Sequence, residues 1–110
     1  LDLVKYASES VILSLLPILD DFERALSATE DEAAKSGIEL IYQKLKRSLE
    51  DKGLKAMETK GLAFDAELHD AVAQVPTDNG AEKGQIIDEA QRGYYLHDKV
   101  LRHAKVIVAN

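Results

Sequence analysis

The spacing of the apolar residues changes near Gly53, and this change constrains the fold more than any other feature of the sequence. Before Gly53, apolar residues recur at steps of three and four, as in a coiled-coil seam: Ile12, Leu15, Leu19, Phe22 and Leu26. After Gly53, apolar and polar residues alternate in short runs, which is typical of half-buried strands. The sequence therefore predicts an α+β fold, with a helical dimerisation region at residues 1–53 and a small, mostly antiparallel β-domain at residues 54–110.

The first helix is predicted from Leu3 to about Ala28, with Pro17 inside it. A proline within a helix removes one backbone hydrogen bond and costs about 3 kcal/mol, so it either ends or bends the helix. Because the apolar spacing continues without a break through Phe22 and Leu26, we expect a bend at Pro17 rather than an end.

A second helix is predicted between Thr29 and Lys52. Thr29 can cap the first turn and Glu32 can reach back to it, while Lys52 followed by Gly53 is typical of a helix end. The apolar face of this helix contains Ala34, Ile38, Ile41, Tyr42, Leu45 and Leu49. The connection between the two helices is short, so they should run antiparallel.

Together the two helices carry more apolar surface than they can bury against each other, because Val11, Leu16 and Ile18 widen the seam on the first one. A symmetric homodimer that pools its helices into a four-helix bundle would bury this surface. The residues predicted to line the dimer interface are Ile12, Leu15, Leu19, Phe22, Leu26, Ile38, Ile41 and Leu45.

The most regular β pattern lies between Gly93 and Val108, after shorter strands predicted at 54–58, 71–75 and from 85 onwards. His97 and Asp98 separate two β-prone runs and are predicted to form a tight hairpin turn, because Asp tolerates unusual backbone angles. The run that follows alternates, and its apolar side contains Val100, Ala104, Val106 and Val108. Gly93 predicts a bulge or a close approach of two backbone segments.

The segment that follows Phe64 contains four residues of metal-ligating types, which are Asp65, Glu67, His69 and Asp70. Alternate residues of an extended segment point to opposite faces, so these side chains would not converge on one ion. We therefore expect no metal site and interpret His69 as a residue that hydrogen-bonds to the backbone and fixes this loop.

The composition excludes several classes of function. The chain has no cysteine, so disulfides and thiolate metal sites are excluded, and its net charge of −6 without a basic stripe argues against nucleic-acid binding. Neither a signal peptide, nor a membrane-spanning apolar run, nor a phosphate-binding glycine loop is visible. An enzyme that uses acids with His69, His97 or His103 is a competing hypothesis, but no serine stands in a recognisable nucleophile context.

Two separated motifs resemble the two halves of the GrpE family signature. The first is Phe64-Asp65-Ala66-Glu67-Leu68-His69-Asp70-Ala71-Val72, and the second is Gly93-Tyr94 with Leu96, Asp98, Leu101-Arg102, Ala104, Val106 and Val108. The resemblance covers nearly the whole chain. One departure is Ala66, which stands where the family commonly has Pro.

Resemblance to this family implies a nucleotide exchange factor, not an enzyme, that uses no cofactor and acts on DnaK-type heat-shock chaperones of the bacterial cytoplasm. The β-domain of a homodimer would bind the chaperone's nucleotide-binding domain and hold its cleft open, so that ADP leaves. Neither nucleic acid nor a membrane is an expected partner. The alternative is a structural dimerisation module without exchange activity, for which the helical region alone would suffice.

The resemblance also implies that five residues contact the chaperone, namely Arg24, Gly37, Phe64, Lys99 and Val108. Each has a simpler interpretation. Arg24 could form a solvated ion pair with Asp20, and Gly37 could be a tolerated surface glycine that costs about 1 kcal/mol relative to Ala.

In the β-domain, Phe64 and Val108 could equally belong to the core, and Lys99 could be a solvated residue beside a turn. Arg102 is expected to stabilise the β-domain rather than to contact a partner.

Overall fold

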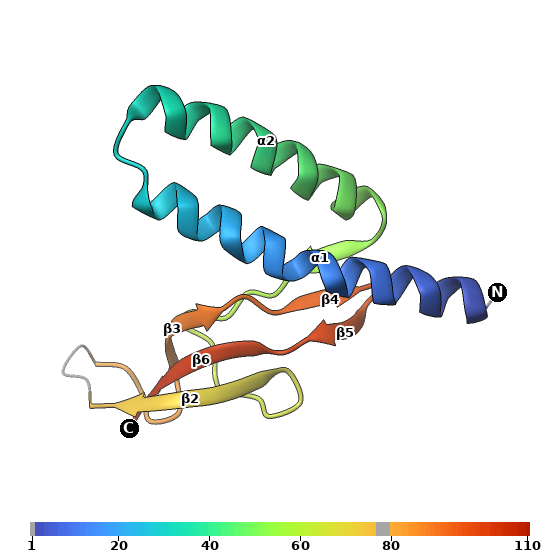
Figure 1. Cartoon of the computed structure of the whole chain (residues 1–110). Helices are drawn as coiled ribbons and strands as arrows, with labels where there is room; N and C mark the ends of the chain where they lie inside the picture. Colours follow the sequence, from blue (N-terminus) through green and yellow to red (C-terminus); the bar gives the residue numbers. More distant parts are fainter. Residues whose placement is uncertain (1, 77–79) are drawn as a thin grey trace. The chain divides into compact units, whose positions relative to one another are not determined.

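The computed structural model describes residues 2–76 and 80–110. The chain divides into two compact units, a helical unit at Leu1–Leu54 and a β unit at Lys55–Asn110. Figure 1 shows the two helices of the first unit and the strands of the second, which confirms the predicted α+β class.

Helix α1 runs from Asp2 to Ala28 and contains Pro17. The helix therefore continues beyond the proline, as the unbroken apolar spacing predicted, and does not end there. The residues of α1 that are almost fully buried are Ile12, Leu16 and Leu19. No helix in the described part of the chain is long and apolar enough to cross a membrane.

Helix α2 runs from Glu32 to Asp51, and its cap is not the predicted one. Asp31 occupies the N-cap position and its carboxylate accepts a hydrogen bond from the backbone N–H of Ala33 at 3.0 Å. Thr29 instead closes α1, because its backbone N–H and its hydroxyl both donate to the carbonyl of Ala25. The prediction of Thr29 as the cap was wrong by two residues, since Thr and Asp both suit this position and only the backbone geometry selects between them.

The end of α2 is as predicted. The N–H groups of Lys52 and Gly53 donate to the carbonyls of Leu49 and Glu50, and Gly53 has a φ of 102°, which a residue with a side chain rarely adopts. The two helices form an antiparallel hairpin (Figure 1), in which the ring of Phe22 lies 6.0 Å from that of Tyr42.

The β unit contains two three-stranded sheets. The strands are β1 (Leu54–Ala56), β2 (His69–Val75), β3 (Ile86–Gln91), β4 (Tyr94–Leu96), β5 (Lys99–Arg102) and β6 (Ala104–Ala109). Their orders are β1-β4-β5 in one sheet and β2-β6-β3 in the other. Strands β4 and β5 pair antiparallel, as do β3 and β6, whereas β2 and β6 pair parallel, so the second sheet is mixed.

The hairpin turn at His97 and Asp98 is confirmed, and both residues have a positive φ, of 50° and 64°. Two successive positive values give the turn a twist that matches the right-handed twist of the flanking strands. The predicted single strand beyond it is interrupted at His103. There the chain leaves one sheet and enters the other, and the N–H of Ala104 donates to the carbonyl of Leu68.

The core of the β unit lies under β3 and β6 and consists of Met57, Ile86, Ala104, Val106 and Val108. The predicted alternation along β6 is therefore confirmed. Gly93 is the close backbone approach that the sequence indicated. A Cβ atom there would lie 2.4 Å from the Ala104 nitrogen and 2.6 Å from the Met57 sulfur, so only glycine fits without a shift of backbone.

Candidate functional site

Two of the residues that the resemblance singles out lie in the helical unit. Arg24 is exposed on α1 and forms an ion pair with Asp21, three residues before it, rather than with the suggested Asp20. Gly37 is exposed within α2, and a Cβ atom added to it would meet nothing within 4 Å. Nothing in the chain itself therefore requires a glycine at this position, although helix propensity disfavours one.

The other three residues lie in the β unit. Lys99 is exposed at the start of β5, directly after the hairpin turn. Phe64 is half-buried, packs against the core and has its ring 5.9 Å from that of His69. Val108 is only 4% exposed and belongs to the core.

The residues predicted to line the dimer interface differ in exposure. Ile12 and Leu19 are buried in the single chain, whereas Ile41 is 58% exposed, and the five others are partly buried. An exposed apolar stripe lies beside the predicted seam on α1 and contains Val4, Val11 and Ile18 at steps of seven residues. Steps of seven keep these side chains close to one line along the helix.

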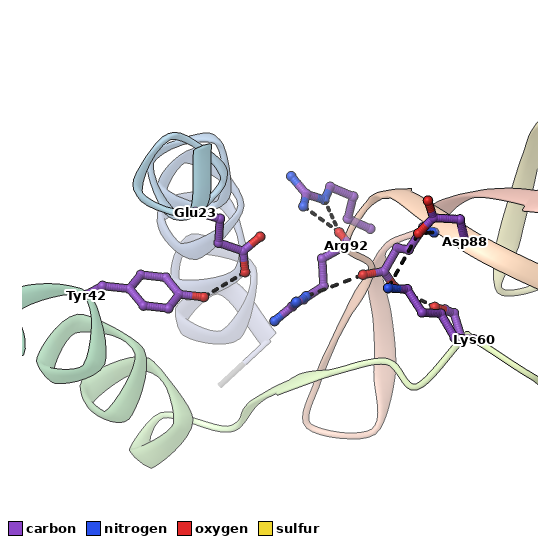
Figure 2. A network of polar contacts seen from close by, with 8 residues as sticks. Glu23, Tyr42, Lys60, Asp88 and Arg92 are labelled. Carbon is purple, nitrogen blue, oxygen red and sulfur yellow. Dashed lines mark hydrogen bonds and ion pairs between the residues drawn. The ribbon is translucent and has the colours of Figure 1, made fainter. Parts of the chain in front are cut away.

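A polar cluster joins the segment after β1 to β3. The buried hydroxyl of Thr59 donates to the carboxylate of Glu89 at 2.7 Å, and Glu89 pairs with Arg92 at 3.5 Å. Lys60 pairs with Asp88 at 3.5 Å (Figure 2). The pKa of Asp88 lies below its ordinary value, because its carboxylate accepts the backbone N–H of Glu89 and lies beside the Lys60 ammonium.

Arg102 holds the ends of β4 and β5 together. Its guanidinium lies over the ring of Tyr94, 5.5 Å from the centroid, and its Nε donates to the Arg92 carbonyl at 3.0 Å. These contacts bear out the interpretation of Arg102 as a residue that stabilises the β unit.

His69 fixes the loop before β2, also as interpreted from the sequence. The residue is only 3% exposed, and its Nδ1 accepts the backbone N–H of Asp65 at 3.0 Å. Among the described residues, no group of three acidic, histidine or cysteine side chains is arranged to hold a metal ion.

The sequence did not predict the hollow that lies beside His69. It has a volume of about 410 Å³ and is lined by Lys55, Ala56, Glu58, Leu62, Ala63, Asp65, Leu68, His69 and Tyr95. These residues come from β1, the loop that follows it, the start of β2 and β4, so no local pattern in the sequence could reveal it. Leu62, a large apolar residue in this loop, remains 48% exposed.

The comparisons with known proteins agree on one family. The GrpE family model matches residues 2–110. Protein GrpE of Porphyromonas gingivalis is 48% identical over 111 residues, which cover 97% of this chain and 57% of that protein. Protein GrpE of Bacteroides thetaiotaomicron is 43% identical over 111 residues, covering 97% of this chain and 58% of that protein. Protein GrpE of Latilactobacillus sakei is 43% identical over 109 residues, covering 98% and 55%. The chain thus spans somewhat more than half the length of these relatives.

Proposed function

This chain belongs to the GrpE family, and on that premise we propose that it is a nucleotide exchange factor for a DnaK-type chaperone of the bacterial cytoplasm. The observation that carries the proposal is the extent of the match, which runs through both helices and the whole β unit. A purely structural dimerisation module would need only the helical unit. In the proposed function this chain binds the chaperone and does not itself react with the nucleotide.

The proposed mechanism is differential binding. The β unit binds the chaperone's nucleotide-binding domain better when its cleft is open, so it shifts the population toward that state and ADP leaves. To move a domain from mostly closed to mostly open requires a difference in affinity of roughly 5 kcal/mol between the two states. Phe64 and Lys99 of the β unit, with Arg24 and Gly37 of the helical unit, are the proposed contact residues, and Val108 supports them from the core.

The acting form in this proposal is a homodimer. Val4, Val11 and Ile18 on α1 and Ile41 on α2 expose apolar side chains in the single chain, at 66%, 59%, 44% and 58%. Monomers rarely leave an apolar stripe of this kind in water. A second copy that brings its two helices against this surface would complete a four-helix bundle, with the partly buried Leu15, Phe22, Leu26, Ile38 and Leu45 beside it.

The direct test is the release of a fluorescent ADP analogue from the chaperone's nucleotide-binding domain. Stoichiometric addition of this chain should accelerate release by orders of magnitude, and an unchanged rate would refute the proposal. Calorimetric titration with and without saturating ADP tests the mechanism separately, because linkage requires ADP to weaken binding of this chain by the factor by which the chain weakens ADP. Equal affinities in the two titrations would exclude a population shift.

Gly37 offers a sharper test of the contact surface. Since a side chain at this position meets open space in the chain, Gly37→Asp should keep α2 helical and leave the fold intact. If a chaperone surface approaches here, the added carboxylate weakens binding and slows ADP release. Release at the wild-type rate would show that Gly37 is merely tolerated.

A further inference from the structure

His69 lines the hollow and has one ring nitrogen without a hydrogen-bond partner among the described residues. Its Nδ1 accepts the backbone N–H of Asp65, so in this arrangement the ring proton lies on Nε2. No residue in the described part of the chain accepts from Nε2. Every fully buried side-chain nitrogen or oxygen in the described residues has a hydrogen-bond partner. Since Nε2 has none, it must keep some accessible surface, although His69 as a whole is 97% buried.

The walls of this hollow combine apolar side chains with charged ones at the rim. Leu62 is 48% exposed, Leu68 and Tyr95 are half-buried, and Ala56 and Ala63 leave the space open. Apolar wall area beside a few placed polar groups is the usual composition of a binding pocket, since the apolar area supplies affinity and the polar groups fix orientation. At about 410 Å³ the hollow has room for a side chain together with its adjoining peptide unit.

The charges at the rim indicate which acceptor the donor meets. Glu58 and Asp65 carry two negative charges and Lys55 one positive charge, so the rim has a net charge of −1. A carboxylate would be repelled here, whereas a neutral carbonyl oxygen would not. The carboxylate of Asp65 accepts the backbone N–H of Glu67 at 2.9 Å.

We propose that this hollow receives an apolar side chain from the chaperone's nucleotide-binding domain, with the adjoining main-chain carbonyl accepting a hydrogen bond from His69 Nε2. The proposal rests on the proposed function and names a contact that none of the family-derived residues supplies. It also assigns His69 a second task, because the same ring fixes its loop through Nδ1 and presents a donor through Nε2.

The test compares two exposed apolar residues of the β unit. Leu62→Ser removes apolar wall from the hollow, whereas Val72→Ser removes a similarly exposed side chain, 52% against 48%, from β2 outside it. Affinity for the nucleotide-free nucleotide-binding domain is measured by calorimetry with the whole chain. We expect Leu62→Ser to raise Kd about tenfold and Val72→Ser to change it by less than about twofold. Leu62→Met, which keeps the apolar wall, should bind as the wild type does.

A second variant isolates the donor. In His69→Asn the side-chain oxygen can take the place of Nδ1 and still accept the Asp65 N–H, while the shorter side chain no longer places a donor at the position of Nε2. We expect this variant to keep the amide-exchange protection of β2 and to bind several-fold more weakly. The proposal is overturned if Leu62→Ser and His69→Asn bind as tightly as Val72→Ser while the wild type binds and releases ADP. A wild-type chain that fails to bind would overturn the proposed function as well.

Discussion

The helical unit and the β unit differ in how completely each buries its own apolar side chains. Of the nine large apolar residues that are exposed among those described, seven lie in the helical unit and only Leu62 and Val72 lie in the β unit. The β unit closes a core around Ile86, Val106 and Val108, whose exposed fractions are 1%, 0% and 4%. The β unit therefore buries nearly all of its large apolar side chains, whereas the helical unit leaves an apolar stripe that the proposed second copy would cover.

The largest expected effect is a loss of stability in the β unit that leaves the helices folded. In Gly93→Ala the new Cβ would lie 2.4 Å from a backbone nitrogen that cannot move without its strand, so the β unit should lose about 3 kcal/mol or more. Hydrogen exchange resolved by residue measures this as lost protection in β3 and β6, with protection in α1 and α2 retained.

Gly37→Ala is the matched control in the helical unit. Its Cβ meets nothing within 4 Å, and Ala favours a helix over Gly by about 1 kcal/mol, so α2 should gain protection. If both alanine variants lowered stability equally, the close contact at Gly93 would not be the cause.

The next effect breaks the proposed association of the helices. Val11→Asp should convert a dimer into a monomer of 12.1 kDa, because each protomer loses about 2 kcal/mol of apolar burial and gains a charge in an apolar interface. Light scattering across a dilution series measures the mass. Val72→Asp changes the same residue type at similar exposure in the β unit and should leave the mass unchanged. A wild-type chain that scatters as a monomer at micromolar concentration would contradict the proposed dimer.

A smaller effect tests whether the two units respond separately. Asp31→Ala removes the carboxylate that caps α2 and should cost about 1 kcal/mol, seen as lost protection in the helices only. Thr29→Ala leaves this cap intact and should cost less. An equal loss in both variants would restore Thr29 as the effective cap.

The smallest effect is a dependence on pH in the β unit. The pKa of Asp88 is lowered in the folded chain, so its ionised form contributes stability above the ordinary carboxyl range, and this contribution is lost as the pH falls through the lowered pKa. Asp88→Asn should therefore flatten the acid side of the stability curve of the β unit. Urea denaturation at a series of acidic pH values measures it, and Lys60→Met should have a similar but weaker effect, since the backbone N–H of Glu89 remains.

The spacing of apolar residues predicted the helices and strands well wherever one face of the element is buried and the other is exposed. The helices, the continuation past Pro17, the turn at His97 and Asp98 and the buried side of β6 all follow from it. The break at His103 does not, because alternation passes through that residue unchanged. The break is made by partners distant in sequence, such as the carbonyl of Leu68, which binds the N–H of Ala104.

The candidate site was predicted less completely, for the same reason. Lys99 could be placed on the surface from its turn, and His69 could be assigned to its loop from the residues around it. The hollow beside His69 is assembled from residues 55–69 and Tyr95 of β4, so it exists only after these segments have come together. Alternation placed Val108 on the apolar side of β6, but it did not decide between a core residue and a contact residue, and the packing places it in the core.

The position of β6 in its sheet has a consequence for how the protein is made. Strands β2 and β3 pair with β6 and not with each other, yet β6 is synthesised after both of them. On the ribosome, α1 and α2 emerge early. Strand β2 cannot pair with β6 until Ala109, the last residue of β6, has been translated. Synthesis that stops near His103 would therefore yield a helical hairpin with a protease-sensitive tail, and limited digestion of such stalled chains would show β2 cut and α2 intact.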